Sequence, residues 1–234
     1  MAVTFGVLAG MGVLTTAPFV DMLISSCQKL YGAKHDKDYP EMHIISLPAP
    51  FDFEGKSNDD LVIESLVRGI KNLVKVEVNF IVVPCNTAHC YYKEMKEAAN
   101  GTPILHIADV SVKNFKKDSK NVAILATEYT LDAGFYQQKL IQSGKNVIDS
   151  KFLRESTTEL ILSIKSRGFE DIVVKKLWEK IISWAIEFKV DALLIGCTDI
   201  SPLTKNEKYP FDIVDTAESL ANATILEYIK LKKN

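Results

Sequence analysis

Two cysteines of this chain occupy equivalent places in a repeated pattern. A short apolar run leads into Cys85, a second such run leads into Cys197, and each thiol is followed by residues that can begin a helix. A long amphipathic segment precedes each run, residues 58–76 in the first copy and 170–189 in the second. Because the peptide dipoles at a helix N-terminus stabilise a thiolate, we predict that both sulfurs lie where they can react.

Polar side chains that could contact a ligand accompany the two thiols. Asn86 and Thr87 follow the first cysteine, and Thr198 follows the second. Asn86 and Thr198 could cap helices through their side chains, and capping is compatible with ligand binding, so we assign both roles to these two residues. The other two cysteines, Cys27 and Cys90, lack this repeated context and are interpreted as small, inert apolar residues.

Apolar runs alternate with amphipathic segments along the whole sequence. Strands are predicted over residues 3–8, 42–47, 80–83, 122–126 and 192–195, with 211–214 as a short strand or a connection. Helices are predicted from Thr16 or Pro18, over 58–76, through Tyr91 and Met95, over 130–141, as two stretches between 155 and 189, and from Asp215 to Leu231.

This alternation predicts an α/β fold with two pseudo-symmetric lobes, each a parallel sheet flanked by helices. We place the first lobe at residues 1–102 and the second at 103–209, with the C-terminal helix within 210–234 returning to pack on the first lobe. Ligands of open parallel sheets bind outside the carboxyl ends of the strands, and both thiols fall at such ends.

Composition excludes several classes of function. The 234 residues are 47% hydrophobic and 25% charged, with a net charge of −2, which is typical of a soluble globular protein and gives no basic surplus for nucleic acid. The uncharged first twenty residues are interrupted by glycines, threonines and Pro18, which favours a buried strand and loop over a signal peptide or membrane anchor. Four cysteines without Cys-x-x-Cys spacing favour a reducing cytoplasm.

Four short motifs together resemble the aspartate/glutamate racemase superfamily, whose members work without pyridoxal phosphate. The motifs are AGMG at 9–12, PCNTAH at 84–89, AT at 126–127 with Thr130 and Tyr136 beyond it, and GCTD at 196–199. The resemblance covers nearly the whole chain, and the two cysteine motifs form its most specific part. It implies two α/β lobes with the site between them, a small amino-acid substrate, neither cofactor nor metal, and a homodimer.

The implied reaction gives a reason for two thiols. Inverting an α-carbon requires a base on one face and an acid on the other, so Cys85 and Cys197 are the expected catalytic pair, each tuned near working pH from an ordinary pKa of about 8.5. The resemblance assigns substrate binding to Met11, Asn86, Thr87, Thr127 and Thr198. His89 and Asp199 are candidates for influencing the two thiols, although each also has a purely structural interpretation. Thr130 and Tyr136 are expected to build the loop and core around Thr127.

The expected substrate is aspartate, with one departure from the aspartate-racemase pattern. That pattern places a proline, a spacer and Asp-Arg after the second strand, and a lysine much later. This chain has Asp52 followed by Phe53, with Lys165 in the later position. Phenylalanine cannot make a bidentate carboxylate contact, so recognition of a distal carboxylate rests on Lys165 with help from Lys56, or the natural side chain is not acidic.

Other functions remain open at this point. Glutamate racemases typically carry an acidic residue in the first glycine loop and a histidine after the second Cys-Thr, where this chain has Ala9 or Met11 and Asp199. Broad-specificity amino-acid racemases, hydantoin racemases and maleate isomerases are alternatives within the superfamily. A two-lobed binder of small molecules without turnover is the non-enzymatic alternative, and solvent exchange at the α-carbon separates it from the enzymes.

Overall fold

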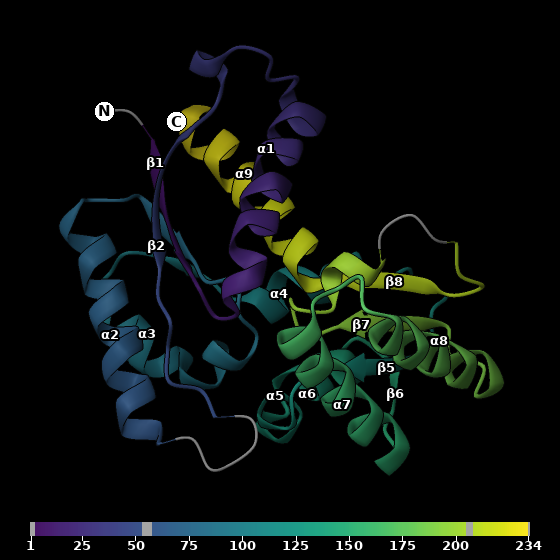
Figure 1. Ribbon diagram of the computed structural model, residues 1–234. Helices are drawn as coiled ribbons and strands as arrows, with labels where there is room; N and C mark the ends of the chain where they lie inside the picture. The colour runs from purple at the N-terminus through teal and green to yellow at the C-terminus, as the bar shows by residue number, and fades with distance from the viewer. Residues whose placement is uncertain (1–2, 53–57, 205–207, 234) are drawn as a thin grey trace. The chain divides into compact units, whose positions relative to one another are not determined.

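The computed structural model describes residues 3–52, 58–204 and 208–233, and its contacts divide the chain into two compact units (Figure 1). The first unit comprises Met1–Ile107 with Ala217–Asn234, and the second comprises Ala108–Thr216. Each unit contains a four-stranded parallel sheet covered by helices. The predicted α/β class with two parallel sheets is therefore confirmed.

The sheet of the first unit has the order β2-β1-β3-β4, with every pair parallel. Its strands are β1 (Thr4–Ala9), β2 (Glu41–Ser46), β3 (Phe80–Val82) and β4 (Ile104–Leu105). Its α-helices are α1 (Thr16–Tyr31), α2 (Asp59–Lys75), α3 (Tyr92–Ala98) and α9 (Thr216–Lys233). Its 3-10 helices are η1 (Val13–Thr15), η2 (Asp36–Asp38) and η3 (Thr87–Tyr91).

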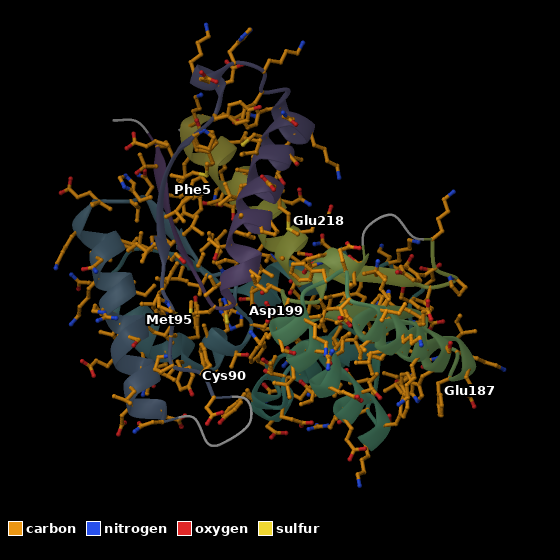
Figure 2. The ribbon with its side chains drawn as sticks, in the orientation of Figure 1. Phe5, Cys90, Met95, Glu187, Asp199 and Glu218 are labelled. Carbon is orange, nitrogen blue, oxygen red and sulfur yellow. The ribbon has the colours of Figure 1, made fainter. Side chains whose placement is uncertain are left out.

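Both faces of the first sheet are apolar. Neighbouring residues of a strand point to opposite sides, and consecutive residues of β1 and β3 are apolar. Leu8 and Ile81 join the core cluster that contains residues of α2 and Met95 of α3. Phe5 and Phe80 stack with ring centroids 5.3 Å apart, and both are buried. Phe5 and Met95 are labelled in Figure 2. The continuous apolar runs of β1 and β3 follow from this burial on both faces.

Helix α9 belongs to the first unit, although it comes last in the sequence. It lies beside α1 (Figure 1), where Ser26 Oγ donates to Asn222 Oδ1 over 2.9 Å. The rings of Tyr31 and Tyr228 also meet, with centroids 6.4 Å apart. The final helix thus packs on the first helix of the chain.

The second sheet has the order β6-β5-β7-β8, again with every pair parallel. Its strands are β5 (Asn121–Leu125), β6 (Asn146–Ile148), β7 (Ala192–Ile195) and β8 (Asp212–Asp215). The helices of this part of the chain are α4 (Ile107–Ser111), η4 (Val112–Asn114), α5 (Glu128–Ala133), α6 (Phe135–Gln142), α7 (Lys151–Arg167), α8 (Ile172–Glu187) and η5 (Ser201–Thr204). The strand order repeats that of the first sheet, so β7 is the counterpart of β3.

The second sheet also buries both faces. Leu125 and Leu193 pack in the cluster formed with α7 and α8, whereas Ile124 and Leu194 pack in the cluster formed with α5 and α6. Helix caps fix the ends of these elements: Ser150 Oγ accepts from Leu153 N at the start of α7, and Asp171 Oδ1 accepts from Val173 N at the start of α8.

Several elements differ from the sequence-based expectations. The two-residue β4 and three-residue β6 were not predicted, because each has only two consecutive apolar residues. The predicted helix 130–141 is divided at Gly134, whose φ of +69° ends α5. The unit boundaries fall after Ile107 and Thr216 instead of 102 and 209, because β4 pairs with β3 and β8 pairs with β7.

No helix in residues 3–52, 58–204 or 208–233 is both long and apolar enough to cross a membrane.

Candidate active site

The two thiols follow counterpart strands. Cys85 lies beyond the end of β3 in the first unit, and Cys197 lies beyond the end of β7 in the second. Both residues are buried, at 7% and 8% relative exposure. A cysteine therefore stands at the carboxyl end of the third strand of each sheet, which is the edge where parallel α/β sheets bind ligands.

The helix expected directly after each thiol is a 3-10 segment instead of an α-helix, and this corrects the prediction. In the first unit η3 runs through Thr87–Tyr91 before α3 begins, and in the second a turn leads to η5 at Ser201–Thr204. A short 3-10 turn has a smaller summed dipole than a long α-helix, so stabilisation of a thiolate here depends more on nearby groups.

The residues after Cys85 form a compact buried turn. Cys85 N donates to Val83 O over 2.8 Å, and His89 N donates to Asn86 O over 3.0 Å. Asn86 and Thr87 are 3% and 4% exposed. Asn86 is the N-cap residue of η3 but makes no side-chain capping bond to it, which removes one of the two roles expected of that side chain.

His89 is a buried residue of the same turn. Its Nε2 lies 3.1 Å from Val83 O, the carbonyl that also accepts from Cys85 N. Its ring stacks with Tyr92 and meets His106, with ring centroids 5.9 Å and 4.8 Å apart. His89 therefore fixes the backbone that carries Cys85, a structural role consistent with one of its two sequence interpretations.

The residues around Cys197 include two groups that bear charge. Cys197 Sγ lies 3.9 Å from Asp199 Oδ2, and the same oxygen lies 2.7 Å from Lys165 Nζ in the last turn of α7. Asp199, labelled in Figure 2, has a side chain only 6% exposed, and that of Lys165 is 31% exposed. The structure thus brings together three of the residues singled out from the sequence, Lys165, Cys197 and Asp199.

Thr198 occupies the turn between Cys197 and η5. It is 5% exposed, and its carbonyl oxygen accepts from Ser201 N over 3.3 Å. Ser201 Oγ in turn donates to Asp215 Oδ1 over 2.9 Å at the end of β8. The bond from Ser201 to Asp215 therefore holds the second cysteine turn against β8.

Thr127 follows β5 and caps α5. Its Oγ1 accepts from Thr130 N over 3.3 Å and lies 3.0 Å from Thr130 Oγ1. Thr130 therefore builds the loop around Thr127, and the fully buried Tyr136 packs in the adjoining core cluster with Ala126 and Leu131, in line with the roles expected of both. Beside this cap, Arg154 of α7 donates to Glu128 Oε2 over 2.8 Å and thereby connects α7 to α5.

The remaining sequence candidates lie in the first unit. Met11 is 7% exposed and packs in the core cluster that also contains Leu47 and Cys85. Asp52 is exposed. Phe53 and Lys56 lie outside the described residues, so the expectation that Asp52 and Phe53 belong to a side-chain pocket lacking the arginine of aspartate racemases stays a prediction.

The other two cysteines, Cys27 and Cys90, lie where burial disfavours the thiolate. Burial raises the pKa of Cys27, partly offset by a hydrogen bond with Tyr31. Burial raises the pKa of Cys90, labelled in Figure 2, to about 11. Thiols with raised pKa values are poor proton acceptors near neutral pH, which agrees with their interpretation as inert residues.

Sequence reasoning did not find the pair formed by Lys165 and Asp199. The two residues are far apart in sequence, and no periodic pattern connects the end of α7 with the turn after β7. Sequence reasoning also did not find His106, which meets both His89 and Tyr92. In the described ranges no group of three or more histidine, cysteine, aspartate or glutamate side chains is placed to hold a metal ion.

Known proteins resemble this chain along most of its length. The broad specificity amino-acid racemase RacX of Bacillus subtilis (strain 168) is 35% identical over 224 residues, which cover 96% of this chain and 97% of the relative. Glutamate racemase of Aquifex pyrophilus is 30% identical over 151 residues, 62% of this chain and 56% of that protein.

A solved structure supports the same relationship. Picrophilus torridus aspartate racemase superposes with a TM-score of 0.82 at 25% identity, covering 97% of this chain and 94% of that chain. The sequence model described as Asp/Glu/Hydantoin racemase matches residues 8–224. With the repeated strand-cysteine arrangement already described, this match leads to one conclusion: the chain belongs to the Asp/Glu/hydantoin racemase family.

Proposed function

We propose that this racemase inverts the α-carbon of free amino acids by proton transfer between substrate and the two thiols, Cys85 and Cys197. The observation that carries the proposal is the internal repeat, which gives each parallel sheet one cysteine at the carboxyl end of its third strand. Two equivalent groups suit a reaction that runs in both directions, because the acid and the base must exchange roles between the two enantiomers.

The proposed step balances without a co-reactant. The thiolate of one cysteine forms an S–H bond with the α-proton, and the electron pair of the broken C–H bond stays on the α-carbon. The thiol of the other cysteine then gives its proton to the opposite face. The step leaves one thiol and one thiolate, with their identities exchanged, so each turnover prepares the enzyme for the reverse direction.

The difficult species in this step is the carbanion, whose charge spreads into the substrate carboxylate. Donors aimed at that carboxylate stabilise the transition state more than the ground state. We propose Asn86, Thr87, Thr127 and Thr198 for this role, because all four are buried polar residues within the turns or caps that follow β3, β5 and β7. Met11 is proposed to contact the substrate through its apolar side chain.

The proposed substrate range is wider than aspartate. Aspartate follows from the resemblance and from Lys165, but Lys165 already forms an ion pair with Asp199. The Bacillus subtilis relative is named as a broad specificity racemase. We therefore propose that aspartate is one substrate among several, and that uncharged amino acids are also accepted.

A panel of single L-amino acids in deuterated water tests this function. We expect the purified protein to replace the α-proton of several amino acids by deuterium and to produce their D-enantiomers, measured by NMR and chiral chromatography. The same samples without protein are the control. Saturable shifts of ligand signals without α-exchange for any amino acid would show a binder instead of a racemase.

A further inference from the structure

The carboxylate of Asp199 and the ammonium of Lys165 form a close pair in the second unit. Asp199 Oδ2 lies 2.7 Å from Lys165 Nζ and 3.9 Å from Cys197 Sγ. The side chain of Asp199 is 6% exposed, and that of Lys165 is 31% exposed. The same carboxylate oxygen of Asp199 therefore contacts the ammonium of Lys165 and the thiol of Cys197.

The burial of Asp199 keeps Lys165 at this carboxylate. A buried carboxylate is strongly unfavourable without an opposite charge, because it has lost its hydration. Moving the ammonium of Lys165 to a substrate carboxylate would remove that charge from Asp199. The gain of a new ion pair would then be offset by the loss of the existing one.

The opposite charges of Lys165 and Asp199 cancel, and this changes which substrate side chains the site favours. A lysine alone would present one positive charge to a substrate side chain, whereas the pair of Lys165 and Asp199 presents none. A substrate with a carboxylate in its side chain would also meet the negative charge of Asp199. A side chain of the same size without charge meets neither cost.

We propose that Asp199 determines side-chain specificity by holding Lys165, so that the site prefers amino acids whose side chains carry no carboxylate. This inference rests on the proposed function and on a place for Lys165 beside the substrate side chain, which its connection to Cys197 through Asp199 supports. It makes Asp199 a residue that sets the substrate class, in addition to its contact with Cys197.

Asparagine and aspartate test the inference, because the two side chains have nearly the same shape and differ in charge. The quantity measured is the kcat/KM for asparagine divided by the kcat/KM for aspartate. In the unaltered enzyme this ratio should exceed one. In Asp199→Asn, which removes the carboxylate that holds the ammonium of Lys165, the ratio should fall at least tenfold, since a charged hydrogen bond to aspartate is no longer opposed by that ion pair.

The ratio separates specificity from the effect of Asp199 on Cys197. A change in the reactivity of the thiol alters the rates for both substrates alike and cancels in the ratio. The double variant Lys165→Met with Asp199→Asn should return the ratio toward its original value. As a matched control, Lys175→Met removes the lysine of an exposed pair with Glu170 and should leave the ratio unchanged.

The outcomes separate this inference from the proposed function. Absence of racemisation across the whole amino-acid panel would contradict the proposed function itself. Racemisation with an unchanged ratio in Asp199→Asn would overturn only the role of Asp199. An unaltered enzyme that prefers aspartate to asparagine would also overturn it, and this measurement needs no variant to fold.

Discussion

Replacing either Cys85 or Cys197 by alanine should reduce racemisation by about 10²–10⁴-fold or more, because general acid–base catalysis contributes that range and each thiol serves one face. Both side chains are small and follow their strands in turns held by backbone hydrogen bonds, so the substitutions should leave the fold intact. The measurement is the rate of appearance of the opposite enantiomer, starting from L and, separately, from D.

Cys27→Ala and Cys90→Ala are matched controls. Both remove a thiol of comparable size, and burial raises the pKa of both thiols, so neither should change the rate appreciably. Full activity in Cys85→Ala or Cys197→Ala would show that this sulfur is neither the acid nor the base. A large loss of racemisation rate in Cys27→Ala or Cys90→Ala, with a normal unfolding curve, would show that the substituted cysteine is not inert.

The single cysteine variants should also differ from each other. A variant that retains one thiolate can still remove the α-proton from the enantiomer that presents it and return deuterium to the same face. Cys85→Ala and Cys197→Ala are therefore expected to exchange the α-proton of opposite enantiomers. Exchange of the same enantiomer by both variants would contradict the assignment of one thiol to each face.

The second large effect is expected at Gly10. Gly10→Ala should lower the free energy of unfolding by about 3–5 kcal/mol, because two costs add. Gly10 has φ of +92°, and an added Cβ would lie 2.4 Å from Leu47 N. That nitrogen donates to Ala9 O over 2.8 Å and continues the pairing of β1 with β2. Urea denaturation measures the change.

Gly32→Ala isolates the conformational part of this cost. Gly32 follows α1 with φ of +74°, and among the residues that the structure describes no non-adjacent one has an atom within 4 Å of an added Cβ. The expected loss there is about 1–2 kcal/mol, from the left-handed conformation alone. Equal losses for Gly10→Ala and Gly32→Ala would show that the approach of Leu47 to Gly10 is not what requires glycine.

The fold was largely predictable because its strands are apolar and its helices are amphipathic. The five predicted strands correspond to β1, β2, β3, β5 and β7. Cys85 and Cys197 were correctly placed after the buried strands β3 and β7. The duplicated order of these elements was visible in the sequence, and it predicted the two parallel sheets. The short strands β4 and β6 were missed because each has only two apolar residues in a row, whereas the equally short β3 lies in the four-residue apolar run 80–83.

The site was less predictable than the fold, since its contacts join residues from distant parts of the sequence. The types of Cys197 and Asp199 suggested an influence of one on the other, and the structure places their side chains 3.9 Å apart. The pairing of Lys165 with Asp199 could not be predicted, because that contact depends on where α7 ends in space. The 3-10 turns after both thiols could not be distinguished from α-helix starts, because each is preceded by a residue type that often caps helices, Asn86 in one and Thr198 in the other.

The position of deuterium early in the reaction tests the two-thiol mechanism most directly. One L-amino acid that the enzyme accepts is incubated in deuterated water, and the enantiomers are separated before a tenth or so of the substrate has reacted. If different thiols serve the two faces, the new D-enantiomer carries deuterium at the α-carbon while the remaining L-enantiomer keeps its proton. Deuterium that enters the remaining L-enantiomer as fast as the product, or a product that retains the original proton, would contradict the account.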